Sequence, residues 1–323
     1  MIDMRLGDVA AVTGGRLHRA TGDEVVTTVE FDSRAVVPGA LFLALPGERV
    51  DGHDFAAAAV AAGAAGVLAG REVDAPSVVA PPAPPGGLAA RSYLAAADRD
   101  GSGAAVLAAL ARLARHVVDT LGQLTVVGVT GSSGKTSTKD LLAAVLAPLG
   151  PTVAPVGSRN NELGLPLTAL SADAATRHLV LEYSARGRGH IAALTTVIPP
   201  RIGVVLNVGR AHLGEFGSRE AIAQAKGELV EALPAGGVAV LNADDPLVAG
   251  MAPRTAARVV TTGRGPADVR AVDVALDAGR PRFRLVTPHG EADVAMRLVG
   301  GHHVGNALAA AAVALELGGT PDG

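Results

Sequence analysis

Ten residues decide the fold of this chain: Gly128–Ser137, with the sequence GVTGSSGKTS. They follow a short apolar run that predicts a β-strand, and they precede a helical pattern that opens at Thr138. Glycines in such a turn let backbone N–H groups approach phosphate oxygens, and the N-terminus of the helix adds the positive end of its dipole. We therefore predict a phosphate-binding loop between a strand and a helix.

Two side chains of this stretch have the chemistry that a nucleotide site needs. Lys135 would reach the β- and γ-phosphates, and the Thr136 hydroxyl would ligate Mg²⁺. The general phosphate-loop pattern, however, places a glycine where this sequence has Val129. A glycine-rich turn with an incidental lysine is therefore the alternative.

The sequence around the loop alternates between apolar runs and helical patterns, which is typical of a parallel, doubly wound sheet. The candidate strands are 124–129, 152–156, 178–182, 202–207, 238–242 and 258–261. Residues 268–299 instead alternate polar and apolar side chains, and this pattern predicts a small antiparallel meander. A last helix is expected over 306–317.

The first 82 residues predict a smaller α/β domain. Its candidate strands are 25–31, 40–45 and 66–69, and its helix spans 55–62 with Asp54 as the N-cap. Pro- and Gly-rich sequence follows, and we take 83–105 as a linker. A helix over about 104–121 then leads into the second domain, 106–323. The predicted fold class is α/β: a small N-terminal α/β domain, then a phosphate-loop ATPase domain with a parallel sheet and a meander.

Composition narrows the functional class. The chain has 323 residues, enough for two domains, with 31 acidic and 28 basic side chains and a net charge of -3. It therefore lacks the basic excess of a nucleic-acid binder, and it has no cysteine for a disulfide or thiolate zinc site. No secretory signal is apparent, and the uncharged run 55–70 is too short to span a bilayer. We expect a cytoplasmic protein without membrane insertion.

Polar side chains close two of the candidate strands. Ligands of open parallel sheets bind outside the carboxyl ends of the strands, so these positions are candidates for a site. Glu182 ends one strand, and its carboxylate could hold Mg²⁺ beside Thr136. Asn207 ends another and is followed by His212, a possible second metal ligand whose alternative is an ordinary loop histidine.

Other polar residues have plain local explanations. Lys226 fits a solvated helix lysine, Asn242–Pro246 fits an Asx turn before proline, and Asn306 fits a helix cap. In the first domain, Asp32–Arg34 follows a strand, and an arginine beside a hydroxyl suits a phosphate or carboxylate. A solvated loop arginine is the alternative there.

Several motifs together resemble one family, the bacterial Mur ligases. The phosphate loop matches nearly letter for letter as far as Asp140, and the family spaces its glycines as this chain does. Further similar motifs lie at 32–34, 47–53, 160–168, 185–191 and 199–233. The resemblance covers nearly the whole chain, and it is strongest with the members that join D-alanyl-D-alanine to UDP-MurNAc-tripeptide.

This resemblance implies roles for the metal-binding and catalytic residues. Thr136 and Glu182 would bind the Mg²⁺ that bridges the ATP phosphates, and His212 would hold a second Mg²⁺. Lys226 falls on a position that is carbamylated in the family, which would let a lysine help to bind a cation. Lys135, Lys226 and His212 would be the catalytic side chains.

The substrate-binding residues follow from the same resemblance. ATP would be held by Thr130, Gly131, Ser132, Ser133, Gly134, Lys135, Thr136 and Ser137, with Asn306 at the adenine. The UDP-linked precursor would be held by Ser33, Arg34, Asn160, Asn161 and Arg186.

The implied reaction is ATP-dependent amide formation in the synthesis of a peptidoglycan precursor. ATP would phosphorylate the terminal carboxylate of UDP-MurNAc-tripeptide, and the amine of D-alanyl-D-alanine would then displace phosphate. The resemblance further implies a monomer in the bacterial cytoplasm that uses ATP and two Mg²⁺ ions, with no nucleic-acid partner.

One departure concerns length. The family carries a third, C-terminal domain, and this chain ends at Gly323, where that domain would begin. We therefore expect the C-terminal domain to be absent and the ligase activity to be impaired. The alternatives are a ligase for another amino acid, on a muramoyl peptide or on folate, and a non-catalytic module that binds a nucleotide and a UDP-sugar.

Overall fold

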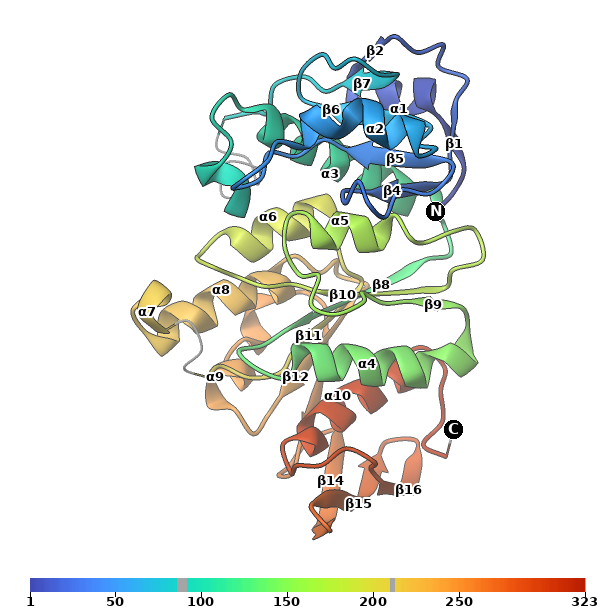
Figure 1. Ribbon diagram of the computed structural model, residues 1–323. Coiled ribbons are helices and arrows are strands. Elements are labelled where there is room, and N and C mark those ends of the chain that lie inside the picture. The colour runs from blue at the N-terminus through green and yellow to red at the C-terminus, as the bar shows by residue number, and fades with distance from the viewer. Residues whose placement is uncertain (86–91, 210–212, 323) are drawn as a thin grey trace. The chain divides into compact units, whose positions relative to one another are not determined.

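A computed structural model of the chain describes residues 1–85, 92–209 and 213–322. The chain divides into two compact units, whose elements are labelled in Figure 1. The first unit comprises Met1–Gly122 and Glu162–Ala174, and the second comprises Gln123–Asn161 and Ala175–Gly323. Within the described residues, no helix combines the length and the apolar character needed to cross a membrane.

The first unit is built on a five-stranded sheet in the order β2-β7-β6-β5-β4, in which all pairs are parallel except β2 with β7. Its strands are β2 Arg16–His18, β4 Thr28–Glu30, β5 Ala40–Leu43, β6 Gly66–Ala69 and β7 Ser77–Val79, and a separate antiparallel pair is formed by β1 Met4–Arg5 and β3 Val25–Val26. Its helices are α1 Leu6–Thr13, α2 Ala56–Ala61, α3 Ser102–Thr120 and α5 Gly164–Ala169, with the 3-10 turns η1 Gly52–Phe55 and η3 Tyr93–Ala96. The central strands β5 and β6 are wholly buried, as their continuous apolar sequence predicts.

Two expectations for this unit are wrong. The single strand expected over 25–31 is two short strands in different sheets, because the chain changes partner at Thr27, whose N–H donates to the Gly39 carbonyl (2.9 Å). The expected cap, Asp54, is replaced by Asp51, whose carboxylate accepts a hydrogen bond from the His53 N–H (3.0 Å) at the start of η1.

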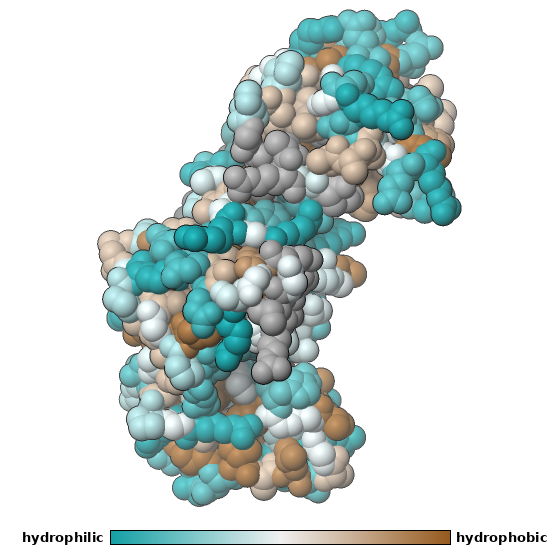
Figure 2. Space-filling model, turned by 90° about the vertical axis from the view of Figure 1, so that its left-hand side faces the viewer, coloured by the Kyte–Doolittle hydropathy of each residue, from teal (hydrophilic) through white to brown (hydrophobic). Residues whose placement is uncertain are grey.

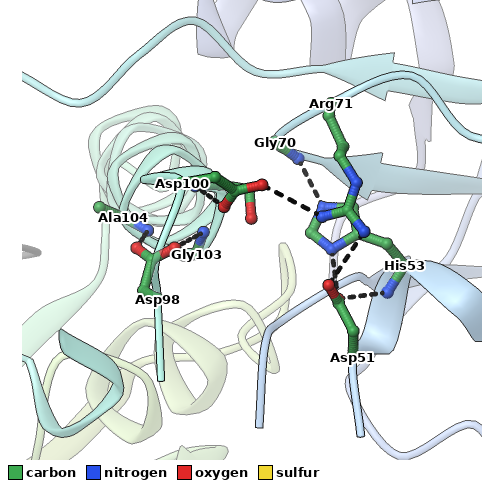
Figure 3. A network of polar contacts seen from close by, with 9 residues as sticks. Asp51, His53, Gly70, Arg71, Asp98, Asp100, Gly103 and Ala104 are labelled. Atoms are coloured by element: carbon green, nitrogen blue, oxygen red, sulfur yellow. Dashed lines mark hydrogen bonds and ion pairs between the residues drawn. The ribbon is translucent and has the colours of Figure 1, made fainter. Parts of the chain in front are cut away.

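A buried histidine ties three segments of the first unit together (Figure 3). His53 Nδ1 lies 2.7 Å from Asp51 Oδ1, and the Gly70 N–H donates to His53 Nε2 (3.1 Å). Since Nε2 accepts, the proton lies on Nδ1 and points to Asp51. Arg71 donates to the other oxygen of Asp51 (2.9 Å) and pairs with Asp100 at 3.4 Å, just before α3.

The division between the units differs from the domain boundary expected at residue 106. Helix α3 begins at Ser102 and packs against α1, β6 and α5, so the whole helix belongs to the first unit, which continues to Gly122. The 3-10 turn η3 and the start of α3 also give structure to part of the expected linker. Residues 86–91 of that linker lie outside the described residues.

The second unit is built on a nine-stranded sheet in the order β16-β15-β14-β13-β12-β11-β8-β10-β9. Its strands are β8 Thr125–Thr130, β9 Thr152–Val153, β10 His178–Glu182, β11 Ile202–Val205, β12 Val238–Asn242, β13 Arg258–Gly263, β14 Val269–Asp277, β15 Arg280–Thr287 and β16 Gly290–Ala295. Its helices are α4 Lys135–Leu146, α6 His190–Val197, α7 Leu213–Phe216, α8 Arg219–Glu231, α9 Pro246–Ala249 and α10 His303–Glu316, with the 3-10 turns η4 Ala147–Leu149 and η5 Ala252–Arg254. The pairs from β9 to β14 are parallel and β14-β15-β16 is an antiparallel meander, so the predicted fold class is confirmed.

Helices cover both faces of this sheet. Helices α4 and α10 lie side by side on one face (Figure 1), where they pack with Val127 and Val129 of β8 in the main apolar core. Gly128 points to the other face, toward α8, and a Cβ there would lie 2.8 Å from the ring of the buried Tyr183. The Tyr183 hydroxyl donates to the Ile198 carbonyl (2.5 Å), which fixes the ring under β8.

Most expected elements of the second unit are present, with changes at their ends. β10 and β12 span the predicted residues, whereas β9 stops at Val153, shortly before Pro155, which cannot donate to a ladder. β11 stops at Val205, before the expected Asn207. Helix α10 begins at His303, so Asn306 lies inside the helix and is not its cap.

Apolar side chains come to the surface around the meander. Figure 2 shows hydrophobic residues scattered among polar ones at the end of the second unit that carries β14–β16. Leu276, Leu298 and Val299 are among the exposed large apolar residues of this region. A cavity of about 560 Å³, lined largely by apolar side chains of α4, α10, β15 and β16, opens there.

Candidate nucleotide-binding site

The predicted phosphate loop connects β8 to α4. Strand β8 lies between β10 and β11, and the chain leaves it to one side for β9 and β10 and to the other for β11 and β12. Such a switch point opens a crevice at the carboxyl ends of the strands. Thr130 ends β8 and is buried, and Lys135, Thr136 and Ser137 form the first turn of α4.

Glycine is required at the last position of the loop. Gly134 has φ of +82°, in the left-handed region that favours glycine. A Cβ at this position would also lie 2.7 Å from Oδ1 of Asn306, which reaches the loop from α10. The predicted adenine contact, Asn306, therefore lies against the phosphate loop and is buried.

Lys135 places its ammonium over the loop. Its Nζ donates to the Gly131 carbonyl (2.8 Å), so the side chain folds back across the turn. Burial lowers the pKa of Lys135, and the nearby carboxylate of Glu182 opposes this shift. The charge is thus held where phosphate oxygens would meet the loop N–H groups.

Asn207 follows β11 and holds the loop, a role that the sequence indicated only by placing it at the end of a candidate strand. Its carbonyl accepts from Ser132 N–H (3.1 Å), its Oδ1 accepts from Ser133 N–H (3.0 Å), and its Nδ2 donates to the Ser133 carbonyl (3.1 Å). Its position at the end of a candidate strand was the available signal.

Glu182 is a buried carboxylate with one oxygen available for a cation. It is fully buried at the end of β10, and its Oε1 has no hydrogen-bond partner among the described residues. Its Oε2 accepts from Asn160 Nδ2 (3.4 Å) and from the Ser158 hydroxyl (3.5 Å). A buried, unpartnered carboxylate oxygen is costly unless a cation neutralises it, so the donor chemistry fits a divalent metal.

Lys226 is buried, not solvated as its local sequence suggested. It lies on α8 with 7% of its surface exposed. Burial, and next the positive charge of Lys135, lower its pKa to about 7. The amine is therefore partly neutral near physiological pH.

The end of the phosphate loop and the first turn of α4 border a cavity of about 350 Å³ in the second unit. Its walls include Gly134, Lys135, Thr136, Ser137, Ser158, Asn160, Ser184, Ala185 and Arg186. The phosphate loop thus faces two of the predicted precursor-binding residues, Asn160 and Arg186. Asn161 is not among the residues that line the cavity.

Two of the predicted precursor-binding residues lie in the first unit. Ser33 and Arg34 belong to the first unit, where Arg34 is largely exposed and pairs with Asp32 at 2.7 Å. Hydrogen bonds from Arg34 lower the pKa of Asp32 to about 2. His212 lies outside the described residues. Within them, no three His, Cys, Asp or Glu side chains gather as a metal site.

A second, smaller cavity lies on the other side of the loop. It has a volume of about 80 Å³ and lies at the ends of β11, β12 and β13, against the start of α10. Asn207, Asn242, Thr262, His302 and Asn306 supply its polar lining. Asn207 and Asn306 thus contact both this cavity and the phosphate loop.

Known proteins resemble the chain along nearly all of its length. Residues 129–314 match the model of the Mur ligase middle domain, and residues 25–116 match that of the Mur ligase family catalytic domain. The UDP-N-acetylmuramoyl-tripeptide–D-alanyl-D-alanine ligase of Mycobacterium bovis is 58% identical over 98% of this chain and 64% of its own length. The ligase of the same name from Escherichia coli is 34% identical over 100% of this chain and 67% of its own length.

Solved structures of other proteins also resemble the chain. MurF from Acinetobacter baumannii has a TM-score of 0.83 at 32% identity, covering 98% of this chain and 66% of its own. MurF ligase from Thermotoga maritima in complex with ADP has a TM-score of 0.75 at 31% identity, covering 92% and 64%. The chain spans about 64% of the length of the curated mycobacterial relatives. Because the middle-domain model matches residues 129–314, more than half of the sequence, the chain belongs to the Mur ligase family.

Proposed function

We propose that this chain carries the ATP-binding and precursor-binding parts of a ligase that joins D-alanyl-D-alanine to UDP-MurNAc-tripeptide. One observation carries the proposal: the phosphate loop and the buried Glu182 and Lys226 are neighbours in one unit, and the loop faces Asn160 and Arg186 across one cavity. The name of the 58% identical relative supports the choice of substrates.

The reaction would take place in two steps at this cavity. A carboxylate oxygen of the tripeptide attacks the γ-phosphorus of ATP, an O–P bond forms, and ADP leaves. The amine of D-alanyl-D-alanine then attacks the acyl carbon, the new C–N bond forms as phosphate leaves, and the amine gives up a proton. Lys135 and the loop N–H groups would stabilise the charge on the phosphate oxygens during the first step.

Thr136 and Glu182 would hold one Mg²⁺ ion. The partnerless Oε1 of Glu182 and a hydroxyl on the first turn of α4 suit this hard cation. When bound, Mg²⁺ would neutralise negative charge on the β- and γ-phosphates. A second Mg²⁺ at His212 remains a prediction from the family resemblance.

Lys226 would act after carbamylation. Its lowered pKa leaves a neutral amine that can attack CO₂, so that a C–N bond forms and a proton is released to water. The resulting anion would relieve the repulsion between Lys226 and Lys135, and it could bind a cation.

The remaining roles belong to the same proposal. Asn160, Asn161 and Arg186 would contact the precursor from the second unit, and Ser33 and Arg34 would bind its UDP part from the first. Thr130, Gly131, Ser132, Ser133 and Ser137 would line the ATP phosphates, with Asn306 at the adenine. We place the protein in the bacterial cytoplasm as a monomer.

The nucleotide part of the proposal is tested by calorimetric titration with ADP, with and without Mg²⁺. We expect Mg²⁺ to strengthen ADP binding to the unmodified chain, and Glu182→Gln to abolish this strengthening, because an amide does not neutralise the cation. Lys135→Met should weaken ADP binding about tenfold or more through the loss of a charge-assisted contact. Glu220→Gln, on the exposed first turn of α8, is the matched control. Mg²⁺ strengthening that persists in Glu182→Gln would contradict the assigned metal ligand.

A further inference from the structure

The segment Leu206–Val208 carries the phosphate loop and lies beyond the end of β11, where the Leu206 N–H still donates to the Thr130 carbonyl of β8 (3.0 Å). Asn207 makes four hydrogen bonds to Ser132 and Ser133, the fourth from the Ser133 hydroxyl to its Oδ1 (3.4 Å), and β11 has already ended at Val205. Buried backbone groups beyond a ladder need other partners. Val208 is 1% exposed, so the partners of its N–H and carbonyl decide where this segment lies.

Three side chains from three elements supply those partners. Asn242, at the end of β12, donates through Nδ2 to the Leu206 carbonyl (2.8 Å). Asp245, the N-cap of α9, accepts from the Val208 N–H through Oδ2 (2.7 Å). Arg219, the first residue of α8, donates to the Val208 carbonyl through Nη2 (2.8 Å) and Nε (3.3 Å). We call Arg219, Asn242 and Asp245 the Val208 brace.

The Val208 brace binds both backbone groups of Val208, and its two charged side chains have opposite charges. A carboxylate holds the Val208 N–H and a guanidinium holds its carbonyl, and both hydrogen bonds are of the stronger, charge-assisted kind. The next residue, Gly209, lies against the loop: a Cβ there would be 3.3 Å from Cβ of Ser132. A shift of Val208 would therefore be passed to the loop both through Asn207 and through Gly209.

A local turn does not account for these contacts. The Asx turn at Asn242 uses Oδ1, which accepts from the Asp244 N–H (3.0 Å), and the α9 cap uses Oδ1 of Asp245, which accepts from the Leu247 N–H (3.0 Å). The Nδ2 of Asn242 takes no part in the Asx turn, and the Oδ2 of Asp245 takes no part in the helix cap. Both atoms instead bind the distant Leu206–Val208 segment.

We propose that the Val208 brace is a positioning device that sets the phosphate loop for the phosphates of the nucleotide. This rests on the proposed function, because it assumes that the loop binds ATP or ADP. Among the described residues, the hydrogen bonds of these three side chains to this region go to Leu206 and Val208 and not to the loop itself, so they are positioning residues. Removal of the Arg219 or the Asp245 side chain should weaken binding of the phosphates and leave binding of the nucleoside unchanged.

The test compares ADP with adenosine on the intact 323-residue chain. Asp245→Asn leaves one acceptor oxygen where two N–H groups need one each, and Arg219→Met removes both donors to Val208. Each variant should weaken ADP binding about tenfold, as expected for the loss of an outer support of a binding site, without weakening adenosine binding. Asp268→Asn is the matched control, since the Asp268 carboxylate holds the Thr261 N–H (2.8 Å) in the same unit.

A variant that carries both Arg219→Met and Asp245→Asn shows whether the two side chains act together on Val208 or independently. Because Arg219 and Asp245 act on the same residue, the double variant should weaken ADP binding by much less than the product of the single effects. Faster hydrogen exchange in the loop peptide 128–137, with an unchanged thermal midpoint, would place the effect in the loop and exclude general unfolding.

The outcomes distinguish the two proposals. If the unmodified chain binds no ADP, both the proposed function and the brace are overturned. If it binds ADP and the variants bind it equally well, or lose adenosine binding in the same proportion, the brace alone is overturned. A variant that unfolds would be replaced by Arg219→Lys, which should recover part of the lost ADP affinity.

Discussion

Among single residues, Lys226 makes the most direct electrostatic prediction. Its pKa falls from an ordinary 10.5 to about 7 because burial removes the ammonium from water, and Lys135 adds a like charge. A group whose pKa is depressed in the folded state binds its proton more readily in the unfolded state. The unfolded chain therefore holds the extra proton between about pH 7 and 10.5, and stability rises with pH across this window.

We predict that the Lys226→Met variant loses this rise of stability with pH. In buffer free of CO₂, the free energy of unfolding of the unmodified chain should rise relative to the variant by up to about 1.4 kcal/mol per pH unit between pH 7.5 and 9. Urea unfolding at several pH values measures this difference. A difference that stays constant across the range would show that Lys226 is not held in a site that disfavours its charge.

A functional residue could be predicted where its signal lies within a short stretch of sequence, and could not be predicted where its role depends on residues distant in the chain. The phosphate loop was recognisable because its residues are consecutive, and Glu182 because it ends a strand. Asn207 was likewise marked as the end of a candidate strand, but its contacts with the loop, and those of Asp245 and Arg219 with Val208, could not be predicted. They depend on β8, β11 and β12 lying side by side. That order is a property of the sheet, not of any local stretch. Lys226 was misjudged because its local helix pattern carries no information about burial.

At the scale of elements, the existence of strands was predictable and their ends were not. Continuous apolar runs mark the central strands because helices cover both faces of the sheet. The ends shift where tertiary contacts take over: β11 ends so that Asn207 can bind the loop, and α10 extends to His303 along α4. The split of 25–31 into β3 and β4 depends on partners that are distant in sequence.

The junction of β6 with α3 in the first unit gives a second stability prediction. Gly70 follows β6, and a Cβ there would lie 2.3 Å from the carbonyl oxygen of Ser102 and 2.5 Å from its Cα. These backbone atoms have little freedom to move, because Asp98 accepts from the N–H groups of Gly103 (3.0 Å) and Ala104 (2.7 Å) (Figure 3).

Gly70→Ala should therefore destabilise the chain by about 3 kcal/mol, at the upper end of overpacking costs. Urea unfolding measures the effect. Gly122→Ala is the control, because a Cβ at Gly122 meets nothing within 4 Å. Equal stability of the two variants would mean that α3 can retreat from β6 at little cost.

At the scale of the whole molecule, the α/β class and the family were both accessible from the sequence. The division of the chain into two units was harder to predict from the sequence. Residues 162–174 belong to the first unit although the sequence on both sides of them belongs to the second, because α5 packs against α3. Packing between elements far apart in the chain sets this division, and the composition of the sequence does not indicate such packing.

The proposed function requires a nucleotide site in the second unit and residues of both units that bind the precursor, so the choice between precursors is its sharpest test. The measurement is a calorimetric titration of the 323-residue chain with UDP-MurNAc-tripeptide, and with UDP-MurNAc-dipeptide in parallel, in the presence of an ATP analogue and Mg²⁺. We predict that the tripeptide binds about tenfold more tightly or better, a difference of about 1.4 kcal/mol. Equal binding of the two precursors, or binding of the ATP analogue with no binding of either precursor, would contradict the proposed substrate.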